Sequence, residues 1–301
     1  MYEVTLEADD GTARVEGKQI IVIQSDLSAR DLDAEPLLTG IQVCDGACDP
    51  NVRMEPAEAT INGMFTRGTR GTHTQGVKIQ ALNLVIGDAL VVTYQQVVTS
   101  SMSYTADCLI KKTGGEDDKG NDLDYLVCTV PPGVGAGLRW SVMMGGEKVA
   151  TSENLETSYA APMVSAITGP NSLTESLPMS TAGGQTIELT GTNLGFEGMD
   201  LNLVQVHYGF SSEMDGEMDA SDFEMLPFVG KVQSSGVQDD ELLVTTGPGY
   251  GQKLSVYVRV GGQVSAVQAA DMLEYAAPTV QGVAVPAGAS HMLSTLDSAG
   301  G

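Results

Sequence analysis

The chain has 301 residues and a mass of 31.4 kDa, which is enough for two or three domains of ordinary size. Hydrophobic residues make up 42% of it, so the composition excludes a chain that is disordered throughout. The net charge of −24 repels phosphate backbones and anionic lipids, which argues against nucleic acid and membrane surfaces as partners. No apolar run reaches the roughly 20 residues of a membrane span, and the N-terminus lacks the pattern of a signal peptide.

Short segments of strand-forming residues recur along the chain, bounded by Gly, Pro, Asp or Asn. Several of them alternate apolar and polar residues, as half-buried strands do. No long segment has a helical period with caps, so the pattern predicts an all-β fold of sandwich type. The predicted strands are 19–24, 77–84, 89–98, 126–130, 138–144, 186–190, 203–208 and 254–260.

The strongest signal is an internal repeat with a period of 116 residues. The segment from Leu126 aligns without a gap on the segment from Leu242, and the identical positions are mainly turn glycines and core-type apolar residues. Each unit reads P-G-x-G, strand, G-G, strand, Y-A-A-P-x-V. The glycine pairs predict tight hairpins that need positive φ angles. These pairs are Gly145 with Gly146 and Gly261 with Gly262.

The segments AGGQTIELTGTNLG, VQVHYG, PGYGQKLSVYVRVGGQVS and YAAP resemble the IPT/TIG family of immunoglobulin-like domains. The segment CTVPPGVGAGL, followed by SVMMGG and YAAP, is similar to the same family one unit earlier. The resemblance implies tandem immunoglobulin-like β-sandwiches. It also implies roles in adhesion, spacing and partner contact, and it implies no catalytic residues.

The repeat predicts two whole IPT/TIG-like domains, at 50–161 and 162–277, and a partial unit at each end. The head, 1–49, is interpreted as the later strands of a unit, with CDGACDPNV in the place of YAAPTV. The tail, 278–301, is interpreted as the first strand or strands of a further unit. Two explanations remain open: the chain is a window of a longer tandem array, or the tail of one copy completes the head of the next by strand addition.

The four cysteines are predicted to form two disulfides, Cys108 with Cys128 and Cys44 with Cys48. At the repeat offset Cys108 aligns with Glu224 and Cys128 with Val244, so the second unit lacks both cysteines together, as it would if they formed one bond. We expect the bond to cross the sandwich. Disulfides indicate an oxidising, extracellular setting. A zinc site is the alternative, although the spacing lacks the paired C-x-x-C pattern.

Two acidic clusters offer oxygen ligands for Ca²⁺. Neither follows the ordered spacing of a calcium loop, so solvated hairpin loops are the favoured interpretation. The candidate ligands are Asp117, Asp118, Asp122, Asp124, Asp215, Glu217 and Asp219.

A small basic island in this acidic chain contains Arg67 and Arg70. It is a candidate contact for an acidic loop of a neighbouring subunit, with ordinary surface charge as the simpler alternative.

No sequence pattern supports catalysis. The glycine-rich segments 133–137 and 247–251 precede strands rather than helices, so they are predicted to be turns and not phosphate loops. The hypothesis is therefore a non-enzymatic extracellular structural protein that requires no cofactor, a subunit or segment of a surface filament assembled head to tail by strand complementation. Its partners would be copies of itself or neighbouring IPT/TIG-like domains. The alternative is an adhesion or ectodomain segment that binds glycans or cell-surface proteins.

Overall fold

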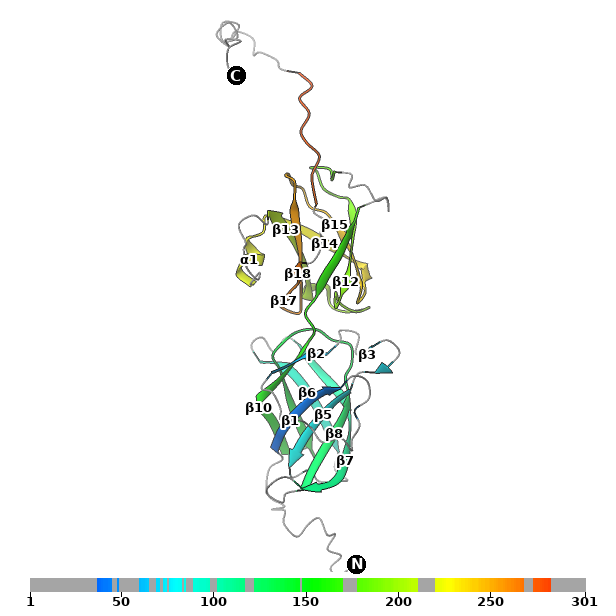
Figure 1. The fold of residues 1–301 in the computed structure, drawn as a ribbon, viewed down its shortest axis with the longest axis vertical. Helices are drawn as coiled ribbons and strands as arrows, with labels where there is room; N and C mark the ends of the chain where they lie inside the picture. Colours follow the sequence, from blue (N-terminus) through cyan, green and yellow to red (C-terminus); the bar gives the residue numbers. More distant parts are fainter. Residues whose placement is uncertain are drawn as a thin grey trace, which may run out of the picture.

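Two β-sandwiches stacked end to end make up the described part of the chain in the computed structural model (Figure 1). The described residues are nearly all β, which confirms the predicted class of tandem immunoglobulin-like sandwiches. The structure describes residues 37–44, 48, 60–64, 69–70, 73–74, 76–82, 84, 89–97, 102–116, 122–146, 148–169, 178–210, 220–267 and 273–282.

The first sandwich is built from the strands that precede the Tyr-Ala-Ala-Pro segment at 159–162. Alternating burial along them matches the alternation in the sequence; in β9 every second residue, from Leu138 to Met144, is buried. The strands are β1 (Leu37–Cys44), β2 (Thr60–Met64), β3 (Thr69–Arg70), β4 (His73–Thr74), β5 (Gly76–Leu82), β6 (Leu90–Gln96), β7 (Ser103–Glu116), β8 (Asp122–Thr129), β9 (Leu138–Met144) and β10 (Lys148–Tyr159).

The strand β7 belongs to both sheets of the first sandwich. Up to Ala106 it pairs with β6, and from Asp107 onward it pairs with β8. One sheet therefore contains β1, β5, β8 and the second part of β7, and the other contains the first part of β7 with β6, β9, β10 and β2. The hydrophobic core fills the space between them and includes Trp140, as the alternation in the sequence suggested.

The second sandwich repeats this arrangement. The strand order β1-β5-β8-β7-β6-β9 of the first sandwich matches β11-β12-β15-β14-β13-β16 of the second, and β14 changes sheets after Gly230 as β7 does after Ala106. Its elements are β11 (Met163–Thr168), β12 (Thr186–Thr192), the 3-10 helix η1 (Leu201–Leu203), β13 (Val204–Phe210), the helix α1 (Ala220–Met225), β14 (Phe228–Val237), β15 (Glu241–Thr245), β16 (Leu254–Val260), β17 (Gln263–Val264) and β18 (Ala266–Val267).

The first sandwich starts earlier than the predicted boundary between residues 49 and 50. The strand Leu37–Cys44 was expected in a separate partial unit, but it pairs along its whole length with β5. Its side chains Leu38 and Ile41 are buried in the core of the first sandwich. The rest of the head, apart from Cys48, lies outside the described residues, as does the tail after residue 282.

The true start of the first sandwich corresponds to the start of the second. Strand β1 has a β-bulge after Leu38, and strand β11 has one after Val164. In the sequence Pro36 precedes β1 as Pro162 precedes β11. The prediction took Pro50 as the equivalent proline because the inserted segment between β1 and β2 is longer than its counterpart in the second unit.

The short helix α1 was not predicted. It falls at the end of an acidic segment and packs on the outside of the second sandwich through Phe223, which stacks on the ring of His207 at 4.3 Å between ring centroids. The Nδ1 atom of His207 also lies 3.0 Å from the carbonyl oxygen of Phe223. His207 therefore has a packing role here.

Candidate functional site at the junction of the two sandwiches

The two predicted glycine hairpins are present. Gly261 and Gly262 form a two-residue turn between β16 and β17, with φ angles of 56° and 87°. Gly145 and Gly146 begin the turn between β9 and β10, with φ angles of 60° and 80°. Because most L-residues with a β-carbon adopt these angles at a cost, both turns favour glycine.

A pair of buried tyrosines ties the last strand of each sandwich to the opposite part of its core. In the first sandwich the hydroxyl groups of Tyr94 and Tyr159 are 2.6 Å apart, and that of Tyr159 donates to the carbonyl oxygen of Pro131 at 2.8 Å. In the second the hydroxyl groups of Tyr208 and Tyr275 are 2.7 Å apart. Because Tyr159 and Tyr275 begin the Tyr-Ala-Ala-Pro segments, this pair fixes the point where the chain leaves each sandwich.

The P-G-x-G turn closes against the tyrosine ring. A β-carbon on Gly133 would lie 2.5 Å from the Cζ and Oη atoms of Tyr159, and one on Gly249 would lie 2.5 Å from the same atoms of Tyr275. In each unit the repeated glycine and tyrosine therefore form the same contact, in which a glycine backbone packs on a buried tyrosine ring.

The stability of both sandwiches is expected to fall in alkali. Burial is the main cause that raises the pKa values of Tyr94, Tyr159 and Tyr275 above the usual 10.0. The pKa of these tyrosines is higher in the folded protein than in the unfolded chain. Their neutral hydroxyl groups therefore contribute fully to stability below about pH 10, and this contribution is lost as the pH rises above that value. Chemical denaturation from pH 8 upward measures this. The double substitution Tyr94→Phe and Tyr159→Phe should flatten the alkaline decline of the first sandwich, and exposed Tyr250→Phe should not.

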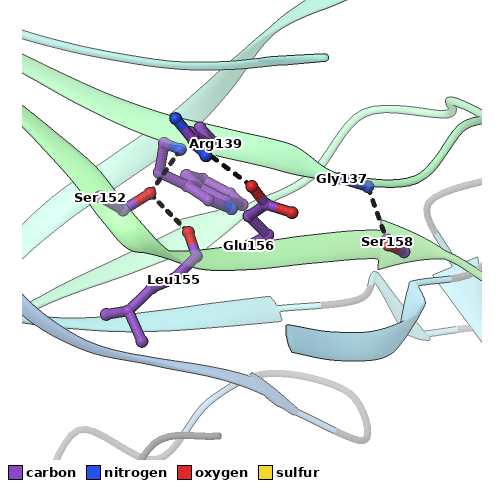
Figure 2. Close-up of polar contacts among 7 residues, drawn as sticks. Gly137, Arg139, Ser152, Leu155, Glu156 and Ser158 are labelled. Atoms are coloured by element: carbon purple, nitrogen blue, oxygen red, sulfur yellow. Dashed lines mark hydrogen bonds and ion pairs between the residues drawn. The ribbon is translucent and has the colours of Figure 1, made fainter. Parts of the chain in front are cut away.

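Strand β10 leads from the glycine turn to the junction and is interrupted by a wide bulge (Figure 2). Residues 152–155 lie opposite the single residue Trp140. The Ser152 hydroxyl accepts a hydrogen bond from the backbone N–H of Trp140 at 2.9 Å and donates to the carbonyl oxygen of Leu155 at 2.7 Å. Both bonds satisfy backbone groups that the bulge removes from the ladder.

Beyond the bulge, side chains fix β10 in register again. The Nε atom of Arg139 lies 2.9 Å from Oε1 of Glu156, and the N–H of Gly137 donates to the hydroxyl of Ser158 at 3.1 Å, as Figure 2 shows. The same stretch pairs in parallel with β2. The final residue, Tyr159, is therefore held from both sides before the linker begins.

The linker of three residues, 160–162, and the residue before it are hydrogen-bonded to the second sandwich. The side chain of Gln263 donates to the carbonyl oxygen of Tyr159 at 3.0 Å, and that of Asn193 donates to the carbonyl oxygen of Ala161 at 3.2 Å. Asn193 has a φ of 57°, a left-handed conformation that asparagine tolerates better than most residues. A short linker with bonded carbonyl groups restricts rotation between the sandwiches.

Apolar side chains of the first sandwich complete the core of the second. Met102 and Val134 are buried and belong to the second core, although both come from loops of the first sandwich. The hydroxyl of Tyr104 holds Val134 in place, because it donates to the Val134 carbonyl oxygen and accepts from its N–H, both at 2.9 Å. Burial of these side chains makes the junction a packed interface.

Glycine allows the closest approach across the junction. A β-carbon on Gly261 would lie 2.6 Å from the backbone nitrogen of Gly135 and 2.9 Å from Cγ2 of Val134. The turn of the second unit thus rests on the P-G-x-G loop of the first, so two repeated motifs contact each other.

Replacing Gly261 with asparagine is expected to open the junction while both sandwiches stay folded. Asn-Gly suits a two-residue turn with positive φ, but the added side chain collides with the loop of Gly135 and should cost about 1–3 kcal/mol of docking free energy. Small-angle X-ray scattering and protease cleavage within 160–162 measure the opening. Gly262→Asn is the matched control, because a β-carbon there meets nothing within 4 Å. Equal scattering and cleavage for the two variants would contradict the expectation.

Both predicted disulfides are present, Cys44–Cys48 and Cys108–Cys128. The expectation that the Cys108–Cys128 disulfide crosses the sandwich is wrong, because the two cysteines face each other on the neighbouring strands β7 and β8 of one sheet. The structural counterpart of this pair is Val232 opposite Val244. The predicted alignment of Cys108 with Glu224 is therefore also wrong, because the segment that contains α1 lengthens the second unit before β14.

Three of the predicted calcium and subunit-contact residues lie on described strands. Asp122 and Asp124 lie on β8 and Arg70 lies on β3. Among the described residues, no group of three or more His, Cys, Asp or Glu side chains is placed to hold a metal ion. The remaining candidates, Arg67, Asp117, Asp118, Asp215, Glu217 and Asp219, lie outside the described residues.

The contacts that sequence reasoning missed are those between units and those that need a gapped alignment. Tyr94 and Tyr208 correspond at an offset of 114 residues rather than 116, so the ungapped repeat did not align them. Met102, Asn193 and Gln263 carried no signal, because each acts across the junction. The glycine-rich segments 133–137 and 247–251 are turns before β9 and β16, as predicted.

No protein-family model and no curated protein matches the sequence. Solved structures with some similarity include the extracellular region of plexin A4 (TM-score 0.29, 15% identity, 82% of this chain and 19% of that chain). InvD of Yersinia pseudotuberculosis has a TM-score of 0.22 and 13% identity over 76% of this chain and 59% of its own. The surface-layer protein SbsC, domains 4–9, has a TM-score of 0.17 and 12% identity, and the match covers 78% of this chain and 32% of that chain. This chain therefore spans about a fifth of the plexin structure, and its fold assignment depends on its own strand order and register.

The described residues define a class of protein, a tandem pair of immunoglobulin-like sandwiches joined by a packed junction. No helix among them is long and apolar enough to cross a membrane. The organised features are a fixed exit strand, a bonded linker and apolar contacts between units, which together hold two domains in line (Figure 1).

Proposed function

We propose that this protein is a non-enzymatic, extracellular structural protein of IPT/TIG-like type, and that it forms a segment of a surface filament or appendage. The observation that carries the proposal is the junction, where Met102 and Val134 of one sandwich enter the core of the next. Such a contact transmits orientation from unit to unit, as a filament requires. The two disulfides support an oxidising compartment outside the cytoplasm.

Contact between complete sandwiches is the assembly route that we propose, in place of strand complementation. In the described structure the first strand of each sandwich pairs within its own copy, β1 with β5 and β11 with β12. The described residues 277–282 are exposed beyond the second sandwich.

Electron microscopy and sedimentation of the purified chain test the proposal. We expect rods of fixed length that join end to end, and we expect a chain shortened to residue 282 to join equally well. Loss of assembly in the shortened chain would favour strand complementation instead. Single rods at every concentration, with capture of a defined glycan on an array, would favour the ligand-binding ectodomain.

A further inference from the structure

The far end of the second sandwich carries a copy of the surface that the first sandwich uses at the junction. In the P-G-x-G loops, Val134 of the first unit corresponds to Tyr250 of the second. Val134 is 1% exposed because the second sandwich covers it, whereas Tyr250 is 69% exposed. The same position is therefore buried at one end and uncovered at the other.

The backbones of the two loops match. Gly135 and Gly251 both have a φ of 106°. The N–H of Tyr159 donates to the carbonyl oxygen of Gly135 at 2.9 Å, and the N–H of Tyr275 donates to that of Gly251 at 2.8 Å. Each loop is therefore held on the last strand of its own sandwich in the same way. Tyr250 in the second loop has the backbone position that Val134 has in the first.

A second apolar side chain of the junction also has a counterpart. A β-carbon on Gly135 would meet the end of the Met102 side chain at 3.0 Å, and one on Gly251 would meet the ring of Phe210 at 2.6 Å. Met102 is 6% exposed, whereas Phe210 is 44% exposed. Phe210 and Tyr250 thus form an uncovered apolar surface, called the end surface below, where the junction has Met102 and Val134.

The turn that would fit the end surface is also uncovered on the same chain. At the junction the buried turn residue is Gly261, whose N–H donates to the carbonyl oxygen of Leu203 at 2.9 Å. Its counterpart in the first sandwich is Gly145, whose N–H donates to the carbonyl oxygen of Ala89 at 3.0 Å. Gly145 is exposed, and it lies in the turn before β10, the strand whose other end reaches the junction. One chain therefore has a docking surface at one end and the matching turn at the other.

We propose that the end surface of one copy binds the Gly145 turn of a second copy, in the way that the loop of Val134 and Gly135 receives the Gly261 turn within one chain. The inference rests on the proposed function and names its contact. A surface and a turn at opposite ends give a heterologous contact that repeats without closing, so the product is a linear polymer. Because each copy carries a net charge of −24, association should strengthen as salt screens the repulsion.

The first experiment is sedimentation of the full chain with Tyr250→Glu. The charge should raise the dissociation constant for self-association at least about 30-fold, as expected for an aromatic residue at the centre of an interface. Met225→Glu is the matched control, because Met225 is 70% exposed but lies on α1. Tyr250→Val introduces the residue that the first loop has at the corresponding position, Val134, so this variant should still self-associate. Equal melting curves for the variants verify that folding is unchanged.

The second experiment mixes two variants that are each blocked at one end. Gly145→Asn keeps a residue that tolerates a positive φ but adds a side chain between the docking faces, so this variant should not polymerise alone. Mixed with Tyr250→Glu, it should form dimers and nothing longer, because only one competent surface and one competent turn remain.

The outcomes separate this contact from the function. Filaments that persist with Tyr250→Glu would overturn the contact and leave the proposed function standing. Dimers of the unchanged chain that Tyr250→Glu abolishes, without any filament, would overturn the contact between end surface and turn, because assembly that stops at two copies indicates that two end surfaces bind each other. A chain that stays monomeric at every concentration and salt would overturn both the contact and the proposed filament.

Discussion

Replacing Gly133 with alanine is expected to lower the free energy of unfolding of the first sandwich by about 3 kcal/mol. The new β-carbon would lie 2.5 Å from the Tyr159 ring. That ring has no room to move, because its hydroxyl is held between the hydroxyl of Tyr94 at 2.6 Å and the carbonyl oxygen of Pro131 at 2.8 Å. The collision is therefore relieved only by breaking buried hydrogen bonds or by moving the loop that docks the second sandwich.

Denaturant unfolding with a probe for each sandwich measures this effect, since two separate cores allow two transitions. Trp140 fluorescence reports on the first sandwich. Gly249→Ala should lower the unfolding free energy of the second sandwich instead, because the same contact there involves Tyr275. Gly169→Ala is the control, because a β-carbon there meets nothing within 4 Å. A loss of the same size in the control and in Gly133→Ala would refute the steric explanation.

Removing the Cys108–Cys128 disulfide by substituting valine at both positions is expected to cost the first sandwich about 3 kcal/mol while preserving its fold. The bond joins residues 20 apart, so it limits the unfolded chain to a closed loop. Valine is the residue that the second sandwich places at both corresponding positions, Val232 and Val244, so the sheet accepts the pair sterically. The loss should therefore come from the unfolded state rather than from altered packing.

The reverse exchange provides the control. Val232→Cys with Val244→Cys places two cysteines opposite each other on β14 and β15, in the register of the natural bond. The pair should oxidise and raise the unfolding free energy of the second sandwich by about 2–3 kcal/mol. Urea titrations with and without reductant give both values. If the valine variant of the first sandwich unfolds at the same urea concentration as the oxidised chain, the loop-entropy argument fails.

Much of the fold could be predicted from the sequence, because it depends on local chemistry repeated in order. Glycine pairs mark turns with positive φ wherever they occur, and alternating apolar residues mark half-buried strands. The Tyr-Ala-Ala-Pro segment marked the end of each unit because the same tyrosine contact is built twice. The pairing of the four cysteines was also correct.

The start of the first sandwich, the position of the disulfide within one sheet and the junction were decided by the tertiary structure. Leu37–Cys44 joins the first sandwich because its apolar face fits the core beside β5, although a longer insertion separates it from β2. Cys108 and Val232 correspond only through strand register. Met102 and Val134 look like ordinary loop residues until a second domain covers them. Local pattern specifies the elements, whereas burial between distant segments depends on which surfaces meet, and that is determined by the packing of the whole chain.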